Sequence, residues 1–187
     1  SMGYNNYVDI LNAKDYNIPQ GRERVFIVSI LKEHDFGFSF PNKQTLKSEV
    51  RDYIDFRECD DITFNFKRRY EEKFGAISDE EFSSYLEALP IRKGIGTKKL
   101  GLYTFDEMDT ITTIDGITGT LTCRNVQNYN KKFLYNGKLY KPSPLMAWRL
   151  MGFSDEDFYK ALNSEGQSDA SLYKQAGNSI ALNVIKE

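Results

Sequence analysis

The N-terminal region carries two β-forming runs separated by a polar connection. Residues 7–11 predict a short strand, and residues 24–31, β-branched and nearly all apolar, predict a second strand that is buried on both faces. Residues 12–21 between them are rich in turn formers and include Pro19 and Gly21. The pattern predicts a hairpin-like unit whose long polar connection is a suitable place for functional side chains.

Helical spacing follows in two segments. Apolar residues recur at helical intervals over residues 45–54, with Thr45 as the N-cap. Ser78 and Glu81 form a capping box that opens a second helix, and Pro90 ends it. Between this helix and residue 139 the pattern changes to small, loop-rich β structure, with strands predicted at residues 102–105, 111–114, 117–123 and 132–135 and turns at 115–116 and 136–137.

The last third of the chain is helical. Ser143 caps a helix with Pro144 at its first position, and its apolar residues, Leu145, Trp148, Leu150 and Met151, are expected in the core. Ser154 opens the next helix, and residues 177–179, Gly-Asn-Ser, open the final one.

Composition narrows the class of protein. The 187 residues suffice for one large or two small domains, with an ordinary balance of 40% hydrophobic and 28% charged residues. Cys59 and Cys123 do not form a disulfide scaffold or a zinc-binding pattern, so no metal site is expected and the protein is expected to be reduced and cytoplasmic. The longest apolar run, residues 25–31, is too short to span a bilayer, so no membrane partner is expected.

Charge is distributed unevenly. The net charge is −2, yet residues 116–154 contain six basic residues and no acidic one. A basic segment on an acidic chain is typical of a local contact with a polyanion, although a chance run on a solvated surface would look the same.

Three segments, in order, resemble conserved motifs of DNA (cytosine-5) methyltransferases. Residues 12–27 contain Gln20, Arg22 and Arg24 in the spacing of the eighth motif, Gln-x-Arg-x-Arg. Residues 141–153 are similar to the ninth motif and residues 175–180 to the tenth. The segment between them fits the family's variable target recognition domain by position, and residues 119–122, Gly-Thr-Leu-Thr, resemble its short Thr-Leu element.

The resemblance implies a mixed α/β and α+β fold. Residues 1–56 would end a partial Rossmann-like catalytic domain, residues 57–139 would be an inserted, loop-rich β target recognition domain, and residues 140–187 would return to the catalytic domain. The implied function is DNA recognition and positioning of base and cofactor in an enzyme that transfers a methyl group from S-adenosylmethionine to C5 of a flipped cytosine. Such enzymes serve bacterial restriction–modification, which implies double-stranded DNA as partner and association with the nucleoid.

The family's Pro-Cys nucleophile, Glu-Asn-Val element and glycine-rich cofactor loop do not occur in this sequence. Cys59 lies between acidic residues and Cys123 follows a threonine on a predicted strand, so neither is expected to be a nucleophile. We therefore expect the chain to need a missing N-terminal catalytic half, to be inactive alone, and to bind the cofactor weakly or not at all. The alternative is a non-enzymatic DNA-binding module or a separate recognition subunit of a split methyltransferase; a nuclease is disfavoured because no acidic metal-binding cluster is evident.

Arg22 and Arg24 are the expected catalytic residues. Their spacing places them on one face of a strand, where guanidinium groups suit a base carbonyl or a phosphate. By resemblance, Arg24 would contact the flipped cytosine, and Arg22 and Gln20 would support it or touch DNA phosphates. The simpler alternative is an ordinary solvent-facing arginine pair.

Asn178 and Ser179 are the expected cofactor contacts. At a helix start, free N–H groups and the helix dipole favour an anion, and the resemblance assigns these residues to the amino-acid end of S-adenosylmethionine. Simple N-capping is the alternative.

The basic segment predicts an edge that faces DNA. Lysines would bind phosphates, and arginine or polar groups would contact base edges. The expected residues are Thr120, Leu121, Arg124, Lys131 and Lys132. A second basic loop, with Arg92, Lys93, Lys98 and Lys99, could also reach DNA, although a mobile surface loop is favoured there.

Overall fold

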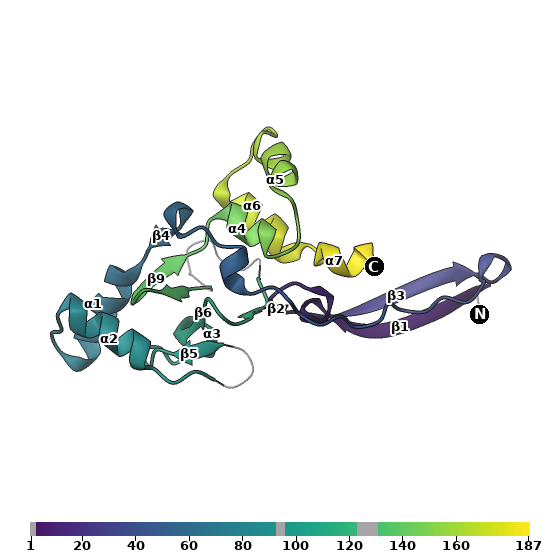
Figure 1. Ribbon diagram of the computed structural model, residues 1–187. Helices are drawn as coiled ribbons and strands as arrows, with labels where there is room; N and C mark the ends of the chain where they lie inside the picture. Colours follow the sequence, from purple (N-terminus) through teal and green to yellow (C-terminus); the bar gives the residue numbers. More distant parts are fainter. Residues whose placement is uncertain (1–2, 93–95, 123–130) are drawn as a thin grey trace.

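A computed structural model describes residues 3–92, 96–122 and 131–187 (Figure 1). A long two-stranded ribbon extends from one side, a small sheet with two helices lies at the opposite end, and a cluster of helices sits over the junction (Figure 1). The architecture is mixed α/β, as the sequence predicts. Among the described residues, no helix has the length and apolar character needed to cross a membrane.

The ribbon pairs β1 (Tyr4–Asn12) with β3 (Glu23–Leu31) in antiparallel register. The connection contains a 3₁₀ helix (Ala13–Tyr16) and β2 (Gln20–Gly21), so the predicted hairpin with a long connection is confirmed. Asn17 adopts the left-handed conformation (φ 58°) after the 3₁₀ helix. Its side-chain oxygen accepts a hydrogen bond from Lys47 N at 2.9 Å, which links the connection to a later segment.

The prediction that residues 24–31 are buried on both faces is wrong. Val25 and Ile27 are 61% and 66% exposed. Their strand has a single neighbour, and only its other face is covered, by the chain that follows the ribbon. In that cover, Phe38 packs on Tyr7 at 5.3 Å between ring centroids and on Phe40 at 5.0 Å.

Residues 45–54 do not form the predicted helix. The chain has no regular secondary structure there apart from a single 3₁₀ turn at Val50–Asp52. Arg51 N donates to Ile114 O at 3.0 Å and Ser48 Oγ donates to Asn17 O at 3.1 Å. Helical apolar spacing is present, but these groups bond to distant segments instead of to the preceding turn.

The five-stranded sheet has the order β4-β9-β8-β6-β5, with β6 and β8 parallel and the other pairs antiparallel. Its strands are β4 (Asp60–Asp61), β5 (Thr97–Lys99), β6 (Thr110–Thr113), β8 (Phe133–Tyr135) and β9 (Lys138–Lys141). The turn between β8 and β9 has Asn136 and Gly137 at φ 48° and 70°, which confirms the predicted hairpin turn.

Two helices pack on this sheet. Helix α2 (Asp79–Ala88) begins at the predicted capping box of Ser78 and Glu81, whereas α1 (Thr63–Phe74) was not predicted. Their apolar faces and the sheet form a separate core that contains Ile62, Phe66, Phe82, Leu86, Leu100, Leu102, Ile111, Leu134 and Leu139.

The strand predicted at residues 102–105 is absent, because a buried carboxylate bonds its backbone. Asp109, at the end of α3 (Asp106–Asp109), accepts hydrogen bonds from the N–H groups of Gly101, Leu102 and Tyr103 at 3.0, 2.7 and 2.9 Å. The strand predicted at 117–123 is reduced, within the described residues, to β7 (Thr118–Gly119), which pairs in parallel with β2.

Gly96 lies where two turns cross. Its φ is 58°, and a Cβ there would lie 2.5 Å from the Cα of Gly116. Gly96 O accepts from both the N–H and the hydroxyl of Thr113, at 2.7 and 2.8 Å. The close approach requires a glycine at this position.

The C-terminal helices are α4 (Pro144–Arg149), α5 (Asp155–Leu162), α6 (Asp169–Asn178) and α7 (Leu182–Lys186). The predicted caps at Ser143 and Ser154 are confirmed, as is the burial of Leu145, Trp148, Leu150 and Met151. The prediction that residues 177–179 open a helix is wrong. Gly177 and Asn178 end α6, Ser179 is its C-cap, and α7 begins at Leu182.

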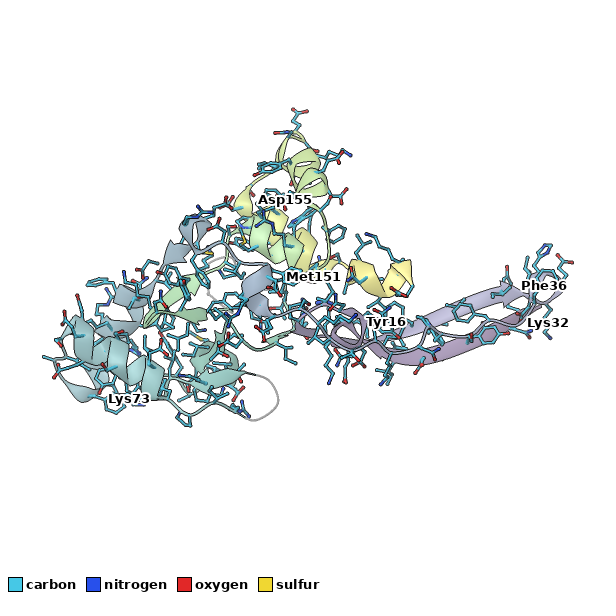
Figure 2. All side chains as sticks on the ribbon, in the orientation of Figure 1. Tyr16, Lys32, Phe36, Lys73, Met151 and Asp155 are labelled. Atoms are coloured by element: carbon cyan, nitrogen blue, oxygen red, sulfur yellow. The ribbon has the colours of Figure 1, made fainter. Side chains whose placement is uncertain are left out.

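A larger core joins the connection of the ribbon to the C-terminal helices, and Figure 2 shows Tyr16 and Met151 at this junction. Leu121 and Phe133 also belong to this larger core, although both come from the segment predicted as residues 57–139. Because this core contains residues from both sides of the predicted domain boundaries at residues 56 and 139, these boundaries stay a prediction.

Replacement of Asp109 by alanine should lower the free energy of unfolding by about 2–4 kcal/mol, because three N–H groups lose a charged acceptor. Asp106→Ala, in the same short helix but with an exposed side chain, should cost less than about 1 kcal/mol. Urea denaturation of both variants tests this, and equal losses would contradict the role of Asp109.

Candidate DNA and cofactor site

Gln20 joins two parts of the molecule. Its side chain is fully buried; Nε2 donates to Leu150 O at 2.9 Å, and Oε1 accepts from Leu121 N at 3.1 Å. One amide thus connects the end of α4 to the segment that follows β7. The expectation that Gln20 touches DNA is corrected, because its polar atoms are buried and already bonded within the protein.

Arg22 joins three segments. It is 4% exposed, Nη1 donates to Leu121 O at 2.8 Å, and Nη2 donates to Gly177 O at 3.0 Å and Ser179 O at 2.7 Å. The planar fork of a guanidinium suits carbonyls that approach from different directions. We call Gln20 and Arg22 the junction pair.

Burial lowers the pKa of Arg22 to about 10, with a smaller contribution from the positive charge of Arg24. The side chain is therefore still charged at neutral pH. Three carbonyl dipoles compensate its desolvation, but Nε is buried with no hydrogen-bond partner among the described atoms.

Arg24 has different surroundings from Arg22. It lies in β3 opposite Leu11, its side chain is exposed, and Nη1 donates to Glu23 O at 2.6 Å. The sequence predicts that Arg22 and Arg24 lie on the same face of a strand. In the structure Arg22 precedes β3 and its side chain enters the junction, so the two guanidinium groups have different surroundings. Arg24 presents its guanidinium to solvent, whereas Arg22 holds protein carbonyls.

Asn178 and Ser179 lie at the carbonyl end of α6. Ser179 N donates to Gln175 O at 3.0 Å, Ser179 Oγ donates to Ala176 O at 3.0 Å, and Asn178 is exposed. The anion site expected at a helix start is therefore corrected, because a helix C-terminus carries partial negative charge. Arg22 holds this turn through Gly177 O and Ser179 O.

The residues expected to face DNA are not all at the surface. Leu121 is 6% exposed and Lys132 is 1% exposed, with Lys132 Nζ 5.6 Å from the centre of the Phe66 ring. These two expectations are corrected, because both side chains pack inside the protein. Thr120 and Lys131 are partly exposed, and Arg124 lies outside the described residues.

The second basic loop has a structural explanation. Lys98 is 4% exposed and Nζ donates to the carbonyls of Leu86 and Glu87 at 3.2 and 2.6 Å, at the end of α2. Lys99 donates to Asp106 O at 2.6 Å. Lys93 lies outside the described residues. Arg92, in the same loop, lines a depression in the surface.

That depression, of about 370 Å³, lies between the β2–β7 pair and the edge of the five-stranded sheet. Its lining combines two cations with hydroxyl groups and one carboxylate: Arg92, Lys131, Thr97, Thr110, Thr112, Thr118, Thr120, Thr122 and Asp106, beside Gly21, Gly119 and Ile117. Sequence reasoning missed most of these threonines. The sequence does contain a signal for two of them. Thr110 and Thr112 alternate with the buried Ile111, which places both hydroxyl groups on one face of β6.

Cys59 does not resemble a nucleophile. Burial raises the pKa of its thiol to about 11, and Sγ contacts Asp55 O at 3.3 Å. The thiolate is therefore scarce at neutral pH. Within the described residues, no group of histidine, cysteine and acidic side chains could hold a metal ion.

Arg22→Lys should destabilise the protein by roughly 2–4 kcal/mol, because an ammonium keeps the buried charge but cannot reach all three carbonyls. Arg24→Lys, at the exposed neighbour, should change stability by less than about 0.5 kcal/mol. Urea denaturation of the two variants compares them directly. A loss for Arg22→Lys no larger than for Arg24→Lys would show that the junction does not depend on the guanidinium.

Similar solved structures agree on the fold. The chain superposes on the methyltransferase EhMeth of Entamoeba histolytica with a TM-score of 0.57 at 16% identity, covering 98% of this chain and 51% of that one. The Dnmt2 methyltransferase of S. pombe gives a TM-score of 0.56 at 17% identity, covering 98% and 54%.

Sequence relatives are more informative. The type II methyltransferase M2.ScrFI of Lactococcus lactis subsp. cremoris is 34% identical over 100% of this chain and 44% of its own length. M.HhaI of Haemophilus parahaemolyticus, also a type II methyltransferase, is 28% identical over 99% of this chain and 52% of its own. The chain thus spans about half the length of these relatives. The family described as C-5 cytosine-specific DNA methylase matches residues 1–187, and the chain belongs to this family.

Proposed function

We propose that this chain recognises DNA and positions the target base within a DNA (cytosine-5) methyltransferase, which transfers a methyl group from S-adenosylmethionine to C5 of a flipped cytosine. The observation that carries the proposal is the junction pair. Gln20 and Arg22 bind Leu121, beside the depression, and Arg22 also binds the turn that carries Asn178 and Ser179. The exposed guanidinium of Arg24 lies two residues away.

Arg24 suits a role on the base itself. Attack at C6 of cytosine places negative charge on the ring, and the base must leave the stack to be attacked. A fixed cation beside the base stabilises that charge without reorganising at the moment of reaction. Because Arg22 anchors the start of β3, the backbone of Arg24 has a defined position from which its side chain can reach a base.

The depression suits a DNA strand. Arg92 and Lys131 supply positive charge for phosphate oxygens. The hydroxyl protons of Thr110, Thr118 and Thr120 are donated to backbone carbonyls, which leaves their oxygens as acceptors for base amino groups. Thr120 Oγ1 donates to Gly21 O at 2.8 Å, so this lining is tied to the residue between Gln20 and Arg22. The lining of the depression is therefore bonded to the backbone of the connection that carries the junction pair.

The turn at residues 177–179 fits one end of the cofactor. S-adenosylmethionine, when bound, supplies the methyl group. Asn178 offers an exposed amide whose oxygen can accept from the ammonium of an amino acid, and the carbonyl end of α6 favours the same group. The remainder of the cofactor pocket and the thiolate nucleophile would come from the part of the enzyme that this chain does not contain.

A split enzyme, with this chain as its recognition subunit, is the second candidate. The 44% and 52% coverage of the two relatives above is what either a piece of one chain or such a subunit would give. Methylation by the chain when the other half is supplied as a separate polypeptide would support the split arrangement.

Joining this chain to the part of M2.ScrFI outside the matched region should give methyl transfer to DNA, whereas this chain alone should give none. In the joined protein, Arg24→Ala should lower kcat at least tenfold, because charge on the base is no longer compensated. Arg68→Ala, an exposed arginine on α1, is the control and should leave kcat within twofold. An unchanged kcat for Arg24→Ala would remove Arg24 from the mechanism.

Duplex DNA binding by this chain alone should be weak and should fall steeply with salt, because phosphate contacts dominate. Arg92→Ala should reduce the slope of log K against log salt by about 0.9, the value for one phosphate contact. Fluorescence anisotropy with labelled duplex at several salt concentrations measures both, with Arg68→Ala as control. Binding that is independent of salt would contradict the electrostatic contact.

A further inference from the structure

One carboxylate lines the depression together with its two cations. Asp106 is the first residue of α3, its side chain is 79% exposed, and it lines the same depression as Arg92 and Lys131. Cations attract DNA phosphates, whereas a carboxylate beside them repels a phosphate. An acidic side chain in this place lowers the affinity for the DNA backbone, which indicates that its partner is a different group.

The two carboxylate oxygens of Asp106 have different surroundings. Lys99 Nζ lies 2.5 Å from Oδ1, and Arg92 Nη1 lies 3.9 Å from the same atom. Within the part of the chain that the structure describes, Oδ2 takes part in no hydrogen bond or ion pair. The hydrogen bond from Lys99 lowers the pKa of the Asp106 carboxyl below its usual value, so the group is ionised at neutral pH. Oδ2 is thus an acceptor that has no proton to donate.

The backbone of Asp106 is held in place. Asp106 O accepts hydrogen bonds from Lys99 Nζ and from Thr110 Oγ1, both at 2.6 Å. Asp109 N donates to Phe105 O at 3.1 Å and closes the turn around Asp106. Lys99 therefore bonds both the main chain and the side chain of Asp106. A side chain positioned in this way can distinguish ligands by where they place their hydrogen-bond donors.

An acceptor without a proton matches the edge of one base in the major groove of DNA. Cytosine presents the N4 amino group there, whereas guanine presents the acceptors N7 and O6 and thymine presents the acceptor O4. Adenine presents an amino group beside the acceptor N7, which a carboxylate repels and an amide side chain binds. Of the four bases, cytosine is therefore the one that a carboxylate favours.

Resting on the proposed function, we infer that Asp106 determines sequence specificity, because its Oδ2 accepts a hydrogen bond from N4 of a cytosine that stays paired in the duplex. Arg92 and Lys131 bind the phosphates near this base and hold its edge at the carboxylate. Thr120 Oγ1, whose proton is donated to Gly21 O at 2.8 Å, offers a second oxygen acceptor in the same depression. The depression thus selects a base in addition to binding the DNA backbone.

The first test is a binding selection with this whole chain. Duplexes with a randomised central segment are bound at low salt, and the bound fraction is sequenced. The wild-type chain should enrich cytosine roughly fivefold or more at one position, and Asp106→Ala should abolish the enrichment at that position. Asp106→Asn should shift the preference there toward adenine, because an amide binds N6 and N7 of adenine together.

Asp79→Asn is the matched control for Asp106→Asn. The Asp79 side chain is 85% exposed and pairs with Lys67 of α1, outside the lining of the depression. Both substitutions remove one negative charge, so a general gain in affinity for DNA should be similar in the two variants. The base preference should change in Asp106→Asn alone. An unchanged preference in Asp106→Asn, or no enriched cytosine in the wild type, would overturn the inference.

N4-methylcytosine at the selected position gives a second readout. Its methyl group replaces the N4 hydrogen that faces the major groove, and the other hydrogen keeps the pair with guanine. By fluorescence anisotropy, the modified base should weaken binding of the wild-type chain roughly fivefold or more and that of Asp106→Ala by less than about twofold. Equal losses in the two proteins would contradict a contact between the carboxylate and the amino group.

The inference and the proposed function fail differently. A cytosine preference that depends on Asp106, without methyl transfer by the joined protein, would contradict the proposed function alone. Methyl transfer by the joined protein at a sequence that Asp106→Ala leaves unchanged would contradict the inference alone.

Discussion

The junction between the ribbon and the C-terminal helices depends on the buried guanidinium of Arg22. Arg22 donates to the carbonyl of Leu121, in the segment after β7, and to the carbonyls of Gly177 and Ser179, at the C-terminal end of α6. A desolvated charge must be compensated, so these carbonyls cannot move apart without leaving it unpaired. Gln20 adds an uncharged link from Leu121 to Leu150. Both side chains belong to the connection between β1 and β3. This connection therefore fixes the position of the depression relative to the turn at the end of α6.

Local signals in the sequence were reliable where local chemistry decides. The capping box at Ser78, the helix start at Ser154 and the Asn136-Gly137 turn are confirmed because neighbouring residues satisfy their own backbone groups. The sequence signals failed where distant partners compete. Residues 45–54 bond to Asn17 and Ile114, and the carboxylate of Asp109 takes the N–H groups of a would-be strand.

For the site, the motif named segments that the structure brings together, but it did not show which of their side chains are buried. Gln20 and Lys132 are polar or charged residues, yet they are 0% and 1% exposed, and no pattern of neighbours in the sequence reveals such burial. Arg22 and Arg24 look equivalent in an extended strand, but β3 begins only at Glu23, and this offset turns one inward and leaves the other exposed. The family resemblance gave the fold class, which the solved structures support.

The crossing of Gly96 with Gly116 affects how mutational scans of this region are interpreted. A methyl group on Gly96 would meet the Cα of Gly116 at 2.5 Å, so the two turns would have to separate. Thr113, bonded to Gly96 O, would move with them, and Thr112 beside it lines the depression. An alanine substitution at this glycine would therefore disturb the lining of the depression without removing any of its side chains, and its phenotype would report backbone spacing instead of side-chain chemistry.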